Sequence, residues 1–318
     1  MNTAVVACMR NEAIFLLEWL AYQLVVGFDT VAVVTNDCTD GTDTLLDEIA
    51  ARDPRIMHIR NDIQSGEAPQ IAGMRNVFQN ERLMAVDYLL HCDSDEFLHV
   101  DVGDKKVDDL IAAAVPADCI ALAWRPFGDS GIKRWEGGLV IAQFTQTTPR
   151  LRYGVTMHKS LFRPCRFGSA TDHMPKCPLN ESVTVVNAKG YEMSPTAMFE
   201  TRRARYTPLT DAHMTWENGC IHHYATRSQD VFLMKNLRGD AMGRADGRYF
   251  LNSKFWNKSN RNDIELPKSR QHLDATLTQI DVFRGIGRVA ALEIDALAQF
   301  KTLRDATLTP EQIAAWTA

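Results

Sequence analysis

Residues 3–36 read TAVVACMRNEAIFLLEWLAYQLVVGFDTVAVVTN, and this stretch decides the fold class. Residues 3–9 and 30–36 are rich in β-branched and apolar side chains, which predicts two buried strands. The segment between them, 13–27, repeats apolar side chains at helical spacing and ends at Gly27, a residue suited to a helix end. A strand, a helix and a second strand at this spacing indicate a parallel pair joined by a crossover helix.

The same alternation continues as far as residue 92. Helices are predicted over 40–54 and 69–85, and strands over 56–60 and 87–92. This order predicts an α/β fold, with a Rossmann-like, mostly parallel sheet flanked by helices on both faces.

Polar residues follow three of the predicted strands directly. Ligands of such sheets bind at the carboxyl ends of the strands, so these residues should meet at one edge. Each group alone could be a turn or a helix cap; three groups at one edge favour a binding site. The groups are Arg10, Asn11 and Glu12; Asn36, Asp37, Thr39 and Asp40; and Asp93, Asp95 and Glu96.

The third group has the most distinctive chemistry. Asp93 and Asp95 are two positions apart, so in an extended chain their carboxylates face the same way. With Glu96 nearby they form a hard-oxygen site suited to Mg²⁺ or Mn²⁺. A calcium-binding EF-hand loop is excluded, because Leu98 and Asp104 stand where it needs glycine and glutamate. A solvated acidic turn and a phosphohydrolase with Asp93 as nucleophile stay open.

Composition and charge narrow the class of protein. The chain has 318 residues, 45% of them hydrophobic and 24% charged, as in soluble globular proteins. A net charge of −5 argues against a nucleic-acid partner. Seven cysteines without a CxxC motif predict reduced thiols, and no signal peptide is recognised. We therefore expect a cytoplasmic protein, and peripheral association with the inner face of the membrane stays open.

Several motifs together resemble the GT-A-fold glycosyltransferases, in particular a family-2-like bacterial group related to glycosyltransferase family 92. The resemblance covers about residues 3–240 and implies a GT-A-like domain over 1–245, with a nucleotide-binding half at 1–100 and an acceptor half at 101–245. It rests on the Asn-Glu pair after the first strand, the acidic loop ending in DGT, CDSDEFL (92–98), FGDSG (127–131), HKSLFRP (158–164) and IHHYATRSQDVFLMKNLRG (221–239).

The resemblance implies metal-dependent transfer of a sugar from a nucleoside-diphosphate sugar, with a UDP-sugar as the expected donor. The acceptor would be a glycan or another hydroxyl compound. Asp93 and Asp95 would hold Mn²⁺ or Mg²⁺ on the donor diphosphate. The residues expected to contact the nucleotide are Asn11, Glu12, Asn36, Asp37, Arg75 and Asn76. A non-catalytic protein that binds nucleotide sugars is a third reading.

The late segment 221–239 carries further candidates. His222 and His223 should point to opposite faces of a strand, and the resemblance favours His223 as a metal ligand. Thr226 and Gln229 have capping-box spacing, which predicts a helix from about residue 228. On that helix Arg227, Lys235 and Arg238 would share one face and could bind phosphates; a solvated face is the alternative.

The residues from 124 to 182 offer candidates for acceptor binding and catalysis. Trp124 and Trp135 could pack on sugar rings, or could belong to the core. Direct displacement needs a carboxylate that takes the proton of the acceptor hydroxyl. Asp172 and Glu181 follow the expected strand KSLFRP, where inverting members of the resembled group carry the base. Asp129 and Glu136 are further candidates, and the sequence does not rank the four.

The last segment, 246–318, is predicted to form a helical C-terminal extension. Thr309 and Pro310 fit the cap and first position of a helix. GIGRVA (285–290) matches a dinucleotide-binding fingerprint, but only 28 residues follow Ala290, too few for the rest of such a unit. We therefore expect a turn between helices there.

Overall fold

The computed structural model describes most of the chain. The boundary expected between residues 245 and 246 lies outside the described residues, as does the side chain of Arg238. The described residues are 1–61, 63–64, 66–114, 116–151, 156–200, 205–207, 209–238 and 249–317.

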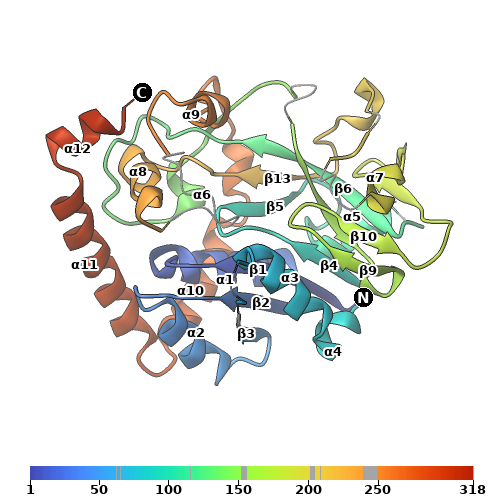
Figure 1. Ribbon diagram of the computed structural model, residues 1–318, viewed down its shortest axis with the longest axis horizontal. Helices are drawn as coiled ribbons and strands as arrows, with labels where there is room; N and C mark the ends of the chain where they lie inside the picture. The colour runs from blue at the N-terminus through green and yellow to red at the C-terminus, as the bar shows by residue number, and fades with distance from the viewer. Residues whose placement is uncertain are drawn as a thin grey trace.

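A 10-stranded sheet organises the molecule (Figure 1). Its main path is β12 (Glu192–Met193), β11 (Val185–Asn187), β6 (Cys119–Pro126), β8 (His158–Phe162), β4 (Tyr88–His91), β1 (Thr3–Met9), β2 (Thr30–Thr35) and β3 (Ile56–Arg60). Strands β4, β1, β2 and β3 are mutually parallel, whereas β8 runs antiparallel to both β4 and β6. The expected mostly parallel α/β sheet is confirmed.

A side branch of this sheet joins two distant parts of the chain. Strand β13 (Gly219–His223) pairs in parallel with β6 and antiparallel with β5 (Glu96–Val100). In this register His223 lies opposite Glu96 and His222 opposite Phe97. The late segment is thereby fixed beside the chain that follows β4.

Helices cover both faces of the sheet, as expected. On one face α1 (Ala13–Val26), α10 (Leu273–Arg284) and α11 (Val289–Thr307) share a hydrophobic core with the sheet, and on the other α3 (Pro69–Phe78) and α4 (Glu81–Met84) do so. The remaining elements are α2 (Thr42–Ala50), α5 (Val107–Ala114), α6 (Val140–Gln143), α7 (Thr196–Phe199), α8 (Gln229–Arg238), α9 (Lys254–Ser259), α12 (Pro310–Ala315), the pairs β7 (Gln146–Thr147) with β14 (Ile264–Glu265) and β9 (Phe167–Ala170) with β10 (Pro175–Pro178), and short 3-10 turns at Pro164–Arg166, Asp211–His213 and Pro267–Arg270.

One predicted helix is divided. The single helix expected over 69–85 is two, because the Asn80 side chain accepts the N–H of Leu83 at 3.2 Å and starts α4 anew. At the C-terminal end the predictions hold. Gly285 ends α10 and α11 begins at Val289, so the expected turn between helices spans 285–288; Thr309 caps α12 by accepting the N–H of Gln312 at 3.2 Å.

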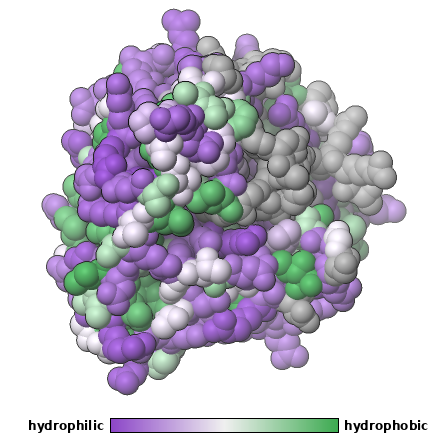
Figure 2. Space-filling view, turned by 60° about the vertical axis from the view of Figure 1, so that its left-hand side comes forward, coloured by the Kyte–Doolittle hydropathy of each residue, from purple (hydrophilic) through white to green (hydrophobic). Residues whose placement is uncertain are grey.

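Helix α11 runs along one side of the molecule, next to α2 and near α8 (Figure 1). In Figure 2, which brings this side forward, hydrophilic residues predominate and hydrophobic ones are scattered among them. Ile294 on α11, 67% exposed, is one of the latter. None of the helices in the described part of the chain is long and apolar enough to cross a bilayer.

Candidate functional site

The site lies where the order of the sheet reverses. From β1 the chain proceeds to β2 on one side, and β4 lies on the other side. In open α/β sheets this is where a crevice forms beyond the carboxyl ends of the strands. Asn11 and Glu12 follow β1 here, and Asp93 and Asp95 follow β4.

The segment carrying the carboxylates is a turn. The N–H of Glu96 donates to the carbonyl of Asp93 at 3.0 Å, and the side chain of Glu96 accepts the N–H of Asp93 at 2.8 Å. The expectation that Asp93 and Asp95 share one face of an extended chain is therefore wrong. The turn gives the two carboxylates different partners.

Asp95 is buried among cationic and imidazole groups. Lys235 of α8 donates to its Oδ2 at 2.8 Å, and His223 Nε2 lies 3.6 Å from its Oδ1. The N–H of Tyr224 also donates to the Asp95 carbonyl, at 2.8 Å, so β13 and this turn are held together. Burial alone would raise the pKa of Asp95, but Lys235 and His223 outweigh it and hold that pKa well below its usual range.

The two adjacent histidines diverge as predicted. His223 faces Asp95, whereas His222 stacks on His99 with ring centroids 4.3 Å apart and is buried in the packing. The proximity of His223 to a carboxylate is thus observed, and its role as a metal ligand stays a prediction.

Asp93 belongs to a second buried ion-pair group. Lys159 of β8 donates to its Oδ2 at 2.9 Å, Gln70 donates to its Oδ1 at 3.0 Å, and Lys159 also lies 3.2 Å from Glu96 Oε2. Burial, reinforced by the neighbouring charge of Asp93, raises the pKa of Glu96 well above its usual range. The positive charge of Lys159 therefore lies between the carboxyl groups of Asp93 and Glu96 and offsets the negative charge there.

Arg227 is fully buried beside the same turn. Its NH1 lies 3.1 Å from Glu12 Oε2, its NH2 donates to the Ser94 carbonyl at 2.9 Å, and its guanidinium lies 3.7 Å from the centroid of the Phe15 ring. Burial lowers the pKa of Arg227 to about 10. The planar guanidinium therefore joins the ends of β1 and β4.

The start of α8 differs from the sequence prediction. Arg227 has a φ of +47° and precedes the helix, so it does not share a helical stripe with Lys235. Thr226 does not cap α8, because the helix begins at Gln229 and the N–H of Gln229 donates to the Ile132 carbonyl at 3.1 Å. The hydroxyl of Thr226 donates to the Phe127 carbonyl instead. Arg227 and Lys235 are both buried, so the reading of a solvated face is wrong for them, while the side chain of Arg238 lies outside the described residues.

A pocket of about 260 Å³ adjoins these groups. The ends of β1 and β2 contribute Asn11, Glu12 and Thr39, and α8 contributes Lys235. Helix α11 supplies the facing wall with Ala296, Gln299, Phe300 and Leu303. A polar side beside an apolar side suits a ligand with a flat ring and a charged end.

The other residues expected at the nucleotide are placed less centrally. Asn36 donates to Asp37 Oδ2 at 3.2 Å at the end of β2, and neither lines this pocket. On α3, Arg75 pairs with Glu67 and Asn76 donates to Asn61 at 2.9 Å. In the described contacts the residue of α3 that reaches the site is Gln70, which binds Asp93.

The chemistry of Asp95 and His223 fits a divalent ion in part. Their facing atoms are 3.6 Å apart, close enough to share one ion. No group of three His, Cys, Asp or Glu side chains arranged as ligands is found among the described residues. Mg²⁺ is commonly held by one or two carboxylates together with substrate phosphates and water, so a site of this kind needs few protein ligands.

The four candidate bases are in different surroundings. Asp172 lies near the site, because its carbonyl accepts Lys159 Nζ at 2.8 Å and its Oδ2 is 3.3 Å from His173 Nε2. Glu181 is exposed, and no described contact brings it to Asp95. Asp129 is buried and accepts N–H groups of Gly131, Gln229 and Asn262, while Glu136 pairs with Arg134, Lys301 and Arg304. The contacts of Asp129 link its loop to α8 and to Asn262, and those of Glu136 link its loop to α11.

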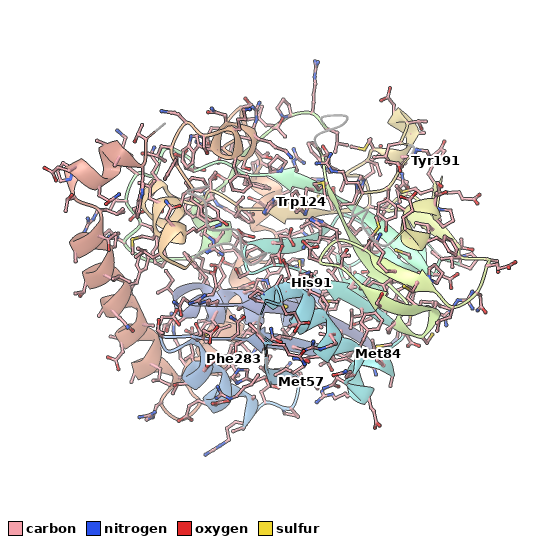
Figure 3. All side chains as sticks on the ribbon, in the orientation of Figure 1. Met57, Met84, His91, Trp124, Tyr191 and Phe283 are labelled. Atoms are coloured by element: carbon pink, nitrogen blue, oxygen red, sulfur yellow. The ribbon has the colours of Figure 1, made fainter. Side chains whose placement is uncertain are left out.

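The two tryptophans have different roles. Trp135 is buried and packs on Phe15, with ring centroids 4.9 Å apart, so it belongs to the core. Trp124 packs on His223 at 4.1 Å and lines a second pocket. Figure 3 labels Trp124 and His91 near the middle of the molecule, far from the exposed Tyr191 at its rim.

Sequence reasoning missed three contributors: Lys159, Gln70 and the wall formed by α11. A signal existed for Lys159, since a lysine inside the apolar strand HKSLF needs a buried acidic partner. Nothing in the sequence indicated that a late helix would face the ends of β1 and β2.

No protein-family model and no curated protein sequence matches this chain. Distant likeness to solved structures is found. The mannosyltransferase PcManGT from Pyrobaculum calidifontis, in complex with GDP-Man and Mn²⁺, is 14% identical, with 99% of this chain and 83% of that chain covered and a TM-score of 0.32.

Two further solved structures resemble this chain at similarly low sequence identity. The apo-form glycosyltransferase GlyE of Streptococcus pneumoniae TIGR4 is 14% identical over 53% of this chain and 35% of its own, with a TM-score of 0.28. A 4-diphosphocytidyl-2C-methyl-D-erythritol synthase is 20% identical over 52% of this chain and 76% of its own, with a TM-score of 0.32. At these scores the likeness assigns no activity, and the relation to family 92 stays a prediction.

Proposed function

We propose that this chain is a glycosyltransferase that takes a sugar from a nucleoside-diphosphate sugar, a UDP-sugar, and transfers it to a hydroxyl acceptor. The observation that carries this is the meeting of Asp95, Lys235, Arg227 and His223 beside the pocket at the end of β1. The nucleoside would occupy the pocket that α11 closes. The diphosphate would lie towards Arg227 and Lys235, whose charges can bind its oxygens.

Asp95 and His223, with Asp93 nearby, would hold Mn²⁺ or Mg²⁺, which supplies neutralisation of charge on the leaving diphosphate. The acceptor hydroxyl oxygen forms the new bond to the anomeric carbon while the bond to the diphosphate breaks. Asp172 is our candidate for the base that takes the hydroxyl proton. Its neighbour His173 packs on Trp124, with ring centroids 5.3 Å apart, and Trp124 packs on His223, so Asp172 lies close to the metal site.

Calorimetric titration of UDP into the wild type and Asp95→Asn, with Mn²⁺ and then with a chelator, tests the proposal. We expect Mn²⁺-dependent binding to the wild type and at least about a tenfold loss in the variant, since a charge-assisted contact contributes about 1.5–3 kcal/mol. Asp101→Asn, an exposed carboxylate paired with Lys268, is the control. Unchanged binding by a folded Asp95→Asn protein would refute the assignment.

A further inference from the structure

A second pocket has His223 in its wall and lies between β6, β13 and the segment around α9. Its lining residues that matter here are Trp124, Trp216, His223, Arg150, Lys258 and Arg261. His223 is shared with the site described above, because its Nε2 lies 3.6 Å from Asp95 Oδ1. A molecule in this pocket would therefore lie beside the bound diphosphate.

The wall of this pocket carries basic side chains. Arg150, Lys258 and Arg261 line it, and no acidic side chain is among the described residues of its wall. Arg261 is oriented by Asp263, whose Oδ2 accepts its Nε at 3.1 Å and its NH2 at 2.7 Å. Asp263 offsets part of the charge of Arg261, and Arg150 and Lys258 supply the further positive charge that would complement an anion.

The same pocket presents fixed aromatic surfaces. Trp216 donates its indole N–H to the Trp124 carbonyl at 3.1 Å, and the guanidinium of Arg125 lies 4.3 Å from its ring centroid. Trp124 is held against His223. These contacts hold the two indole rings at fixed positions in the wall of the pocket.

Aromatic surfaces and basic side chains in one wall favour a polar ring that carries an acid. Resting on the proposed function, we propose that this pocket, which encloses about 50 Å³, binds the acidic group of the acceptor, and that the acceptor is an anionic sugar with a carboxylate or a phosphate group. The donor nucleoside has its own pocket against α11, so the two substrates would meet at His223 and Asp95.

Calorimetry with matched neutral and acidic probes tests this on the full chain. One pair is p-nitrophenyl β-D-glucoside and p-nitrophenyl β-D-glucuronide; the other is glucose and glucose 6-phosphate. We expect the acidic member to bind at least about tenfold more tightly in one pair, because charge-assisted contacts favour it. The pair that shows the preference distinguishes carboxylate from phosphate.

Lys258→Met should reduce that preference, whereas Lys254→Met should not. Both lysines are exposed on α9, but only Lys258 lines the pocket. UDP binding with Mn²⁺ is measured on the same samples. If UDP binds normally and neither acidic probe is preferred, or if both lysine variants behave alike, the inference is overturned and the proposed function is not.

A third arm compares UDP-glucuronate with UDP-glucose. If Lys258→Met removes a preference for UDP-glucuronate, the pocket holds the donor sugar and the acceptor assignment is overturned. Acidic probes that bind while UDP does not would instead support the pocket and contradict the proposed function.

Discussion

Glu18 is a buried carboxylate on α1 whose oxygens accept the N–H groups of Val140 at 2.7 Å and Ile141 at 2.9 Å. Burial raises its pKa to about 7 despite these hydrogen bonds. In the unfolded chain the pKa of a glutamate is about 4.3. The folded state therefore holds this proton more tightly than the unfolded state does.

Linkage gives the sign of the effect. Because the native state binds more protons between about pH 4.3 and pH 7, the contribution of Glu18 to the free energy of unfolding falls as pH rises through that window, by about 4 kcal/mol in all. Glu18→Gln should remove this fall. Urea unfolding at pH 5 and pH 8 measures it, and an identical pH difference in the wild type and the variant would contradict the assignment.

The side chains of the site could be named from the sequence but not oriented. Asp95 was predictable because it follows a strand end, whereas geometry said only that His222 and His223 diverge, and the family resemblance favoured His223. The partners of Asp93 were not, because Lys159 and Gln70 come from a strand and a helix whose contacts depend on tertiary packing. Arg227 was expected near the diphosphate, and it does lie beside the turn that carries Asp95. Its position before α8 depends on its positive φ, which the sequence did not indicate.

At the scale of elements, helix α11 forms the wall of the pocket that faces Asn11 and Lys235. A larger side chain on this wall is therefore expected to block the pocket. Ala296 is buried in that wall, so Ala296→Phe should fill the space expected for the nucleoside and weaken UDP binding by about tenfold or more. Ala298→Phe adds the same side chain at an exposed position of the same helix. Calorimetry checks both, and a folded Ala296→Phe protein that binds UDP normally would show that the nucleoside lies elsewhere.

The alternation of strands and helices up to residue 92 was predictable because apolar periodicity and end signals agree there. Beyond it, the segments of β8 and β13 were expected to be strands, but their pairing and the strand β5 were not predicted, since the partners are distant in sequence. The division of α3 from α4 depends on one Asn80 side chain.

At the scale of the whole molecule, the C-terminal helices share a core with α1 and the sheet. Phe283 of α10 is fully buried in that core. Phe283→Ala should lower the free energy of unfolding by about 3–5 kcal/mol, and the whole chain should still unfold in one transition. Val282→Ala, at a position 55% exposed, is the neighbouring control.

Urea unfolding followed by circular dichroism and by tryptophan fluorescence checks this. Coincident transitions that shift together are the expected result. A separate early transition in the Phe283→Ala protein, with the rest unchanged, would mean that 246–318 folds as an independent unit.

The central claim is transfer from a nucleoside-diphosphate sugar, and its most direct measurement is nucleoside-diphosphate release from a panel of UDP-, GDP- and TDP-sugars with Mn²⁺. We predict release of UDP from a UDP-sugar by the wild type, faster with an acceptor sugar present, and none by Asp95→Asn. Absence of any nucleoside-diphosphate release, or release of inorganic phosphate through a covalent aspartyl-phosphate on Asp93, would contradict the account.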